Sequence, residues 1–108
     1  ILDPRDGALL AMASRRPDPR TTAATALAEP FEPGSTIKPF IAAKLLDLGR
    51  AKPDEVVETF NGELTIEGRT IHDSHKAPRM SLRDVIAYSS NVGIVRFAQR
   101  LSAREQYE

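Results

Sequence analysis

The sequence predicts a mixed α/β domain of the α+β type, in which helix is the more frequent element. Apolar residues recur three or four positions apart from Ser35 onward and again in the last third of the chain, which is the period of an amphipathic helix. Between these segments, residues 56–71 alternate between apolar and polar positions around glycine turns, as short strands do. The chain has 108 residues, 41% of them hydrophobic and 28% charged, which is enough for one domain at most.

The first 14 residues predict an N-terminal β-hairpin. Asp3-Pro4 and Asp6-Gly7 supply the residues that a tight turn needs, because proline fixes φ and glycine accepts a positive φ. The first strand would have only two residues, so we expect an edge strand or a piece of a longer strand. Residues 15–34 contain four prolines and predict an irregular surface loop, with a short helical piece at Thr22–Leu27.

A helix of about four turns is predicted to begin close to Ser35. Pro39 is compatible with this start, because the first N–H groups of a helix have no partner within the helix. Gly49 follows the last apolar position and suits the left-handed residue past a helix C-terminus. The apolar positions that define the helix are Ile37, Ile41, Leu45 and Leu48.

The second half of the chain predicts small strands followed by short helices. Residues 56–71 predict a small region of short β-strands. Residues 72–80, which are polar and include Pro78, predict a loop. Ser81 and Asp84 have the spacing of a capping box ahead of a helix that runs to about Tyr88. A second helix follows with Ile94, Phe97, Ala98 and Leu101 on its apolar face, and Ser102–Glu105 predict the start of a further helix.

Charge and composition argue against several classes of function. The 15 basic and 15 acidic residues give no net charge, so we expect no nucleic-acid partner that binds through a basic surface. No apolar run approaches the roughly 18 residues that a membrane span needs, so we expect no membrane contact from this segment. The absence of cysteine excludes disulfides and thiolate metal sites.

Ser35 and Lys38 form the first candidate catalytic pair. Three residues make about one helical turn, so Ser35 Oγ and Lys38 Nζ can lie on one face within hydrogen-bond distance. A serine becomes a nucleophile when a neighbouring base takes its proton, and a lysine with a lowered pKa can be that base. Backbone N–H groups at the helix start would suit an oxyanion. The alternative is that Ser35 is a helix cap and Lys38 a solvated side chain.

The second candidate is the polar break Tyr88–Gly93 between two apolar-faced helices. In a serine acyl-transferase, a second hydroxyl can pass a proton to the leaving amine while an amide holds the peptide group of the substrate. The alternative interpretation is a simple helix junction, in which Ser90 or Asn91 caps the next helix, and the two interpretations are compatible.

The segment His72–His75 contains the letters of a catalytic triad and a pair of histidines. Adjacent residues of one loop do not easily reach the geometry of a triad, and two histidines with one carboxylate rarely make a specific metal site. We therefore expect a structural or surface role for this segment and no metal.

Taken together, these segments resemble the monofunctional (class B) penicillin-binding proteins. Serine-x-x-lysine followed by serine-x-asparagine is the motif order of the active-site serine enzymes that recognise penicillin. The resemblance covers essentially the whole chain, through Leu2–Ser14, Phe31–Pro39, Ile71–Asp73 and Ser89–Gly93.

The resemblance implies a D,D-transpeptidase that crosslinks peptidoglycan in cell division or cell-shape maintenance. Ser35 would attack the D-Ala-D-Ala stem peptide with Lys38 as its general base. Ser89 would relay a proton to the leaving amine, and Asn91 would hold the substrate amide. The implied partners are stem peptides, β-lactams, which acylate the serine, and other cell-wall synthesis proteins. Neither a cofactor nor a metal is implied.

The sequence departs from the family in one respect, because no Lys-Thr-Gly or Lys-Ser-Gly motif occurs in it. In the family this third motif lies far downstream, on a strand that supplies carboxylate recognition and part of the oxyanion hole. We therefore expect residues 1–108 to be the N-terminal part of a transpeptidase domain of the penicillin-binding protein and serine β-lactamase type. Alone they should be inactive, and the missing C-terminal part would complete the site. The resemblance also implies a membrane-anchored parent protein at the extracytoplasmic face of the bacterial cytoplasmic membrane.

Two alternatives share the same fold. A non-catalytic β-lactam-sensing, binding or scaffolding domain would keep the serine and lysine for acylation or not at all, and would work by binding. A serine β-lactamase is the other, and the sequences Glu32–Ser35 and Ser89–Asn91 argue against it by resemblance only.

Overall fold

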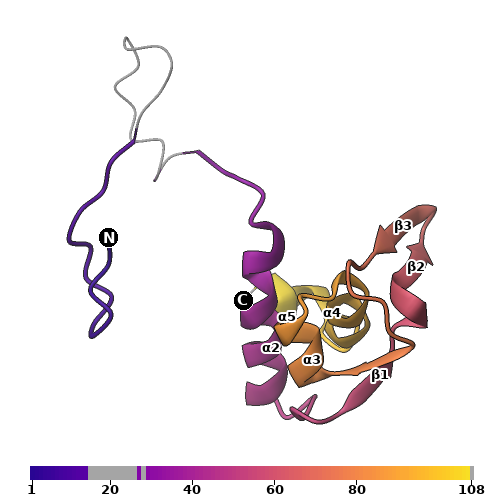
Figure 1. Cartoon of the computed structure of the whole chain (residues 1–108). Coiled ribbons are helices and arrows are strands. Elements are labelled where there is room, and N and C mark those ends of the chain that lie inside the picture. The colour runs from indigo at the N-terminus through magenta and orange to yellow at the C-terminus, as the bar shows by residue number, and fades with distance from the viewer. Residues whose placement is uncertain (15–26, 28, 108) are drawn as a thin grey trace. The chain divides into compact units, whose positions relative to one another are not determined.

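The computed structural model describes residues 1–14, 27 and 29–107. The chain forms two compact units, Ile1–Glu32 and Pro33–Glu108. The labelled helices and strands, which consist of described residues, and every candidate site residue lie in the second unit (Figure 1).

In the first unit, the described residues form one tight turn. Leu2 and Leu9 pair as a single antiparallel bridge. The carboxylate of Asp3 accepts hydrogen bonds from the backbone N–H and the guanidinium of Arg5, and Gly7 has a φ of +76°. The predicted hairpin is therefore present as one bridge rather than as two strands, because its first strand has too few residues to make a ladder. Residues 22–26 of the predicted helical piece lie outside the described residues, and Leu27 at its end is helical.

The helices of the second unit lie where the apolar periods predicted them, except that α4 ends at Ala98 and Leu101 of its predicted face lies beyond the helix. The predicted helix from Ser35 is confirmed as a 3₁₀ turn that continues into an α-helix, with Gly49 at a φ of +63° after its end. The capping box of Ser81 and Asp84 is also confirmed. The helical elements are η1 (Gly34–Ile37), α2 (Lys38–Asp47), η2 (Phe60–Gly62), α3 (Leu82–Ala87), α4 (Asn91–Ala98) and α5 (Ala103–Tyr107).

The strands form two small antiparallel sheets. β1 (Val56–Glu58) pairs with β4 (Arg79–Ser81), and β2 (Glu63–Ile66) pairs with β3 (Arg69–His72). The β2–β3 hairpin extends away from the helices (Figure 1). The prediction of a loop over residues 72–80 was wrong at its two ends, where His72 completes β3 and Arg79–Met80 begin β4. Met80 is buried opposite Val57 of β1, so a long-range pairing decides its conformation.

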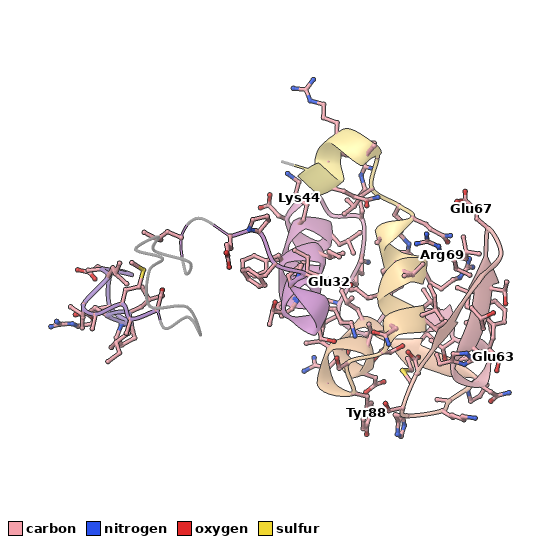
Figure 2. The ribbon with its side chains drawn as sticks, turned by 90° about the horizontal axis from the view of Figure 1, so that it is seen from above. Glu32, Lys44, Glu63, Glu67, Arg69 and Tyr88 are labelled. Carbon is pink, nitrogen blue, oxygen red and sulfur yellow. The ribbon has the colours of Figure 1, made fainter. Side chains whose placement is uncertain are left out.

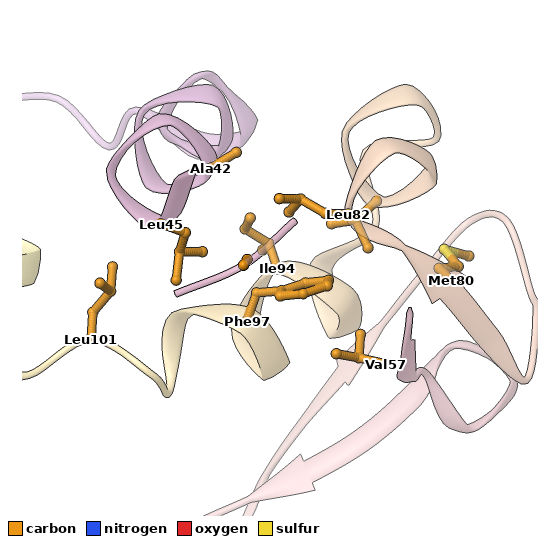
Figure 3. Close-up of a cluster of buried hydrophobic side chains, with 10 residues drawn as sticks. Ala42, Leu45, Val57, Met80, Leu82, Ile94, Phe97 and Leu101 are labelled. Atoms are coloured by element: carbon orange, nitrogen blue, oxygen red, sulfur yellow. The ribbon is translucent and has the colours of Figure 1, made fainter. Parts of the chain in front are cut away.

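The core of the second unit lies between α2, α3 and α4 on one side and β1 and β4 on the other (Figure 3). Phe97 is fully buried at its centre, and Leu45 of α2 and Val85 of α3 are equally inaccessible. This packing fixes α2 against the junction between α3 and α4. The two candidate motifs, which lie on these elements, are thereby brought together.

Candidate active site

The start of α2 positions Ser35 and Lys38. Gly34 has a φ of +55°, a conformation that favours glycine, and it turns the chain into η1. The hydroxyl of Thr36 donates to the carbonyl of Pro33 at 2.6 Å and closes this turn. Ser35 is exposed, whereas Lys38 is only 5% exposed, so the hydroxyl faces solvent and the amine is shielded from it.

The buried amine of Lys38 bridges to the polar break between α3 and α4. Its Nζ donates to the carbonyl oxygen of Ser89 at 2.5 Å, to Ser89 Oγ at 3.0 Å and to Asn91 Oδ1 at 2.7 Å. The structure thus joins three of the predicted site residues. The direct bond between Ser35 Oγ and Lys38 Nζ stays a prediction, since the bonds just described join the amine to the Ser89–Asn91 segment.

A left-handed residue presents this segment to Lys38. Ser89 has a φ of +54°, which is unusual for a residue with a side chain, and it separates the end of α3 from the start of α4. The next residue, Ser90, is buried and caps α4 by accepting a hydrogen bond from the backbone N–H of Gly93 at 2.8 Å. The alternative role of this segment as a helix junction is therefore confirmed for Ser90.

Asn91 connects the lysine to strand β3. While its Oδ1 accepts from Lys38, its Nδ2 donates to the backbone carbonyl of His72 at 2.9 Å. The amide is thereby fixed in one orientation by two hydrogen bonds. Its position next to the amine and partly open to solvent suits an amide that also contacts a bound peptide.

The side chain of Asp73 binds the segment that contains Ser90, Asn91 and Val92. Its carboxylate is buried and accepts hydrogen bonds from Ser90 Oγ and from the backbone N–H groups of Asn91 and Val92. A carboxylate at the N-terminus of a helix also interacts favourably with the helix dipole. Asp73 therefore holds the start of α4 in place. This segment includes Asn91, whose side chain accepts from Lys38, and it directly follows Ser89.

The sequence does not single out Asp73 for this role. The expectation of a structural or surface role for His72–His75 holds for Asp73 in its structural form, since Asp73 is 6% exposed. Asp73 directly follows β3, and its hydrogen bond to Ser90 spans 17 residues, so neither local spacing nor a local motif in the sequence indicates the pairing.

Burial and charge act in opposite directions on the Lys38 amine. Burial lowers the pKa of Lys38, because it disfavours the charged ammonium, and the negative charge of Asp73 raises it in part. The larger of the two effects is burial, so the pKa lies below the usual value for a lysine. A lower pKa makes the neutral amine, which can accept a proton, more accessible than in a solvated lysine.

The hydrogen bonds of Lys38 account for all three N–H donors of an ammonium. After loss of one proton, the amine would have a lone pair and could accept from the hydroxyl of Ser89 or of Ser35. The site thus combines a shielded amine with two serine residues, Ser35 and Ser89, that are exposed to solvent. This is the combination that serine acyl transfer needs.

The comparisons with known proteins assign the chain to a family. The model of the penicillin-binding protein transpeptidase domain matches residues 1–108, and the chain belongs to this family. It is 33% identical over its full length to the probable peptidoglycan D,D-transpeptidase PenA of Neisseria gonorrhoeae. It is 34% identical over 96% of its length to the probable peptidoglycan D,D-transpeptidase PbpC of Pseudomonas aeruginosa.

Solved structures agree with this assignment. The apo TP domain of penicillin-binding protein 3 from Burkholderia pseudomallei is 36% identical, with a TM-score of 0.72 over 78% of this chain and 25% of that chain. The fold is therefore a mixed α/β part of the penicillin-binding protein transpeptidase fold, as predicted.

The chain spans about a fifth of the length of the curated relatives that it matches first. Among the described residues, no helix has the length and apolar character that crossing a bilayer requires.

Proposed function

We propose that this chain is the N-terminal part of the catalytic domain of a peptidoglycan D,D-transpeptidase, with Ser35 as nucleophile. The observation that carries the proposal is the buried amine of Lys38, one turn from Ser35 and hydrogen-bonded to both Ser89 and Asn91. A solvated helix lysine would have no such partners, so the structure favours the catalytic interpretation of the motif over the capping one.

In the acylation step, Ser35 Oγ attacks the carbonyl carbon of the penultimate D-alanine of a stem peptide, and its proton passes to the neutral amine of Lys38. The peptide bond to the terminal D-alanine then breaks. Its nitrogen takes a proton through Ser89 Oγ, which lies 3.0 Å from Lys38 Nζ, and D-alanine leaves. The product is an ester between Ser35 and the shortened stem peptide. Asn91 would hold the substrate amide.

In the second step, the amine of a neighbouring stem peptide attacks the ester carbonyl. Its proton returns through Ser89 and Lys38 to Ser35 Oγ, so the new peptide bond forms and the enzyme is restored. A β-lactam would follow the first step only: Ser35 opens the strained ring, the ring nitrogen takes the proton, and the acyl group stays on the serine.

We further propose that other residues of the parent protein complete the site. The third family motif is absent from residues 1–108. The outer face of α2 is apolar and open, with Phe40 71% exposed and Ile37 43% exposed. A groove of about 770 Å³ runs along this face and is lined in part by Phe40, Ala43, Asp47 and Gln106. This face beside Ser35 suits strands that carry the third motif, since an apolar patch of this kind is rarely left uncovered.

The substrate determines where the parent protein would work. Peptidoglycan lies outside the cytoplasmic membrane, so a transpeptidase must present Ser35 at the extracytoplasmic face, in a membrane-anchored parent protein. Its partners there would be stem peptides, β-lactams and other proteins of cell-wall synthesis. Within the family, one relative is named FtsI, a peptidoglycan D,D-transpeptidase of Buchnera aphidicola.

The proposal is tested by release of D-alanine from a pentapeptide stem that ends in D-Ala-D-Ala. We expect the full-length protein to release D-alanine and to transfer the acyl group to an added D-amino acid, and Ser35→Ala to do neither. Ser102→Ala is the matched control, because it changes a serine at the start of α5 that is bonded to Glu105. Equal release by wild type and Ser35→Ala would contradict the proposal.

A further inference from the structure

His75 and Tyr88 form an aromatic stack beside the candidate site. Their ring centroids lie 4.1 Å apart, and the ring planes are inclined by only 8°. His75 belongs to the segment between β3 and β4, and Tyr88 is the C-cap residue that follows α3. Tyr88 is 53% exposed, and its side chain lies at the edge of the helical unit (Figure 2). The role of this stack does not follow from the mechanism above.

The position of Tyr88 in the chain gives the stack its significance. Tyr88 directly precedes Ser89, the residue with a positive φ whose carbonyl and hydroxyl oxygens both accept from Lys38. Non-glycine residues do not favour this conformation, so the surrounding contacts must hold it. The backbone contacts are two: the N–H of Ser89 bonds to Ile86 at 3.2 Å, and that of Ser90 bonds to Val85 at 2.9 Å.

The segment after β3 contacts this turn at two points, one on each side of Ser89. Asp73 accepts hydrogen bonds from Ser90 and Asn91, on the side of α4. His75, two residues later, stacks on Tyr88, on the side of α3. Without the second contact, the α3 end of the turn would depend on the backbone bonds of the helix end and on the bonds from Lys38 to Ser89, and helix ends fray.

We propose that His75 is a positioning residue: its stack on Tyr88 holds Ser89 in the left-handed conformation that places the Ser89 oxygens against Lys38. The inference rests on the proposed function, since Ser89, the residue that the stack positions, is the proton relay of that site. His75 touches no reacting atom. It acts through Tyr88, and a planar ring is the only property of His75 that the stack needs.

The first test measures amide hydrogen exchange at Ser89 and Ser90 in the full-length protein. The stack stabilises the turn, so its loss in His75→Ala should raise the exchange rates of both amides by about threefold to tenfold. His75→Phe keeps a planar ring and should exchange like wild type. Lys76→Ala is the matched control on the same segment, because the Lys76 side chain lies over Gly62 rather than on Tyr88. Unchanged exchange in His75→Ala would overturn the proposal.

The second test measures the rate of acylation by a fluorescent penicillin in the same variants. We expect a fall of about threefold to tenfold in His75→Ala and in Tyr88→Ala, and wild-type rates in His75→Phe and Lys76→Ala. The double variant with both His75→Ala and Tyr88→Ala should be acylated no more slowly than the slower single variant, because each substitution removes the same stack. Multiplied effects, or no recovery in His75→Phe, would overturn the proposal. Failure of the wild type to be acylated would contradict the proposed function instead, whereas the exchange experiment reports on the stack by itself.

Discussion

The amine of Lys38 lies 3.0 Å from the hydroxyl of Ser89, although the two residues are 51 positions apart in the chain. The packing of α2 against α3 and α4 over a shared core creates this contact. It turns two short motifs, each of which has an ordinary helix-capping interpretation, into one site.

Replacement of Lys38 by methionine tests the base. Methionine can occupy the buried space of the side chain but can neither accept a proton nor bond to Ser89 and Asn91. We expect the acylation rate to fall by about 10²–10⁴-fold, the usual contribution of a positioned general base. Lys52→Met removes an exposed lysine and should leave the rate unchanged. The measurement is the rate of adduct formation with a fluorescent penicillin, and a Lys38→Met protein as fast as wild type would exclude Lys38 as the base.

The pH dependence of acylation should report the lowered pKa of Lys38. Only the neutral amine can take the proton of Ser35, so the rate should rise with pH as the ammonium loses its proton. Because burial lowers the pKa of Lys38, the midpoint of this rise should lie below the usual lysine value of about 10.4. A rate profile with its midpoint at or above that value would show that Lys38 stays charged and is not the base.

Asp73→Asn separates the charge of Asp73 from its shape. The negative charge of Asp73 raises the pKa of Lys38, so its removal should lower that pKa further and move the acylation midpoint to lower pH. The variant should also lose about 1–3 kcal/mol of unfolding free energy, because the hydrogen bonds to Ser90 and the start of α4 weaken. An acylation midpoint that moves to higher pH would contradict the claim that the charge of Asp73 raises the pKa of Lys38. The free energy of unfolding is measured by urea denaturation.

Gly93→Ala should destabilise the protein because no space exists for a methyl group. An added Cβ would lie 2.3 Å from Val85 Cγ2 and 2.9 Å from Ser90 Oγ. Gly93 is helical, so crowding and not backbone conformation is the cause, and we expect a loss of about 1–3 kcal/mol. In the Val85→Ala background the loss should be smaller, since one of the two contacts is removed. An equal loss in both backgrounds would show that Val85 is not the obstacle.

Local patterns predicted much of the fold. The helix from Ser35 to Gly49, the capping box of Ser81 and Asp84 and the break at Ser89–Asn91 all depend on residues within a few positions of one another, and the structure confirms them. β4 was not predicted, because Met80 becomes part of a strand only through its pairing with Val57. Strand pairing between distant segments leaves little trace in either segment alone.

The candidate site divides in the same way. The serine and lysine of the first motif and the serine and asparagine of the second could be found from spacing and from a family resemblance. The role of Asp73 could not, since its bonds to Ser90 and Asn91 form only after β3 and α4 have been brought together. The stack of His75 on Tyr88 is hidden for the same reason.

The most direct test of the central claim is the position of the acyl group after incubation with penicillin. Trypsin does not cleave before proline, so Lys38-Pro39 stays intact, and Ser35 and Lys38 remain together on the peptide 21–44. Mass spectrometry of the full-length protein should find one penicillin on this peptide, assigned by fragmentation to Ser35, and no adduct in Ser35→Ala. An adduct on a different peptide, or one that persists in Ser35→Ala, would contradict the assignment of Ser35 as the nucleophile.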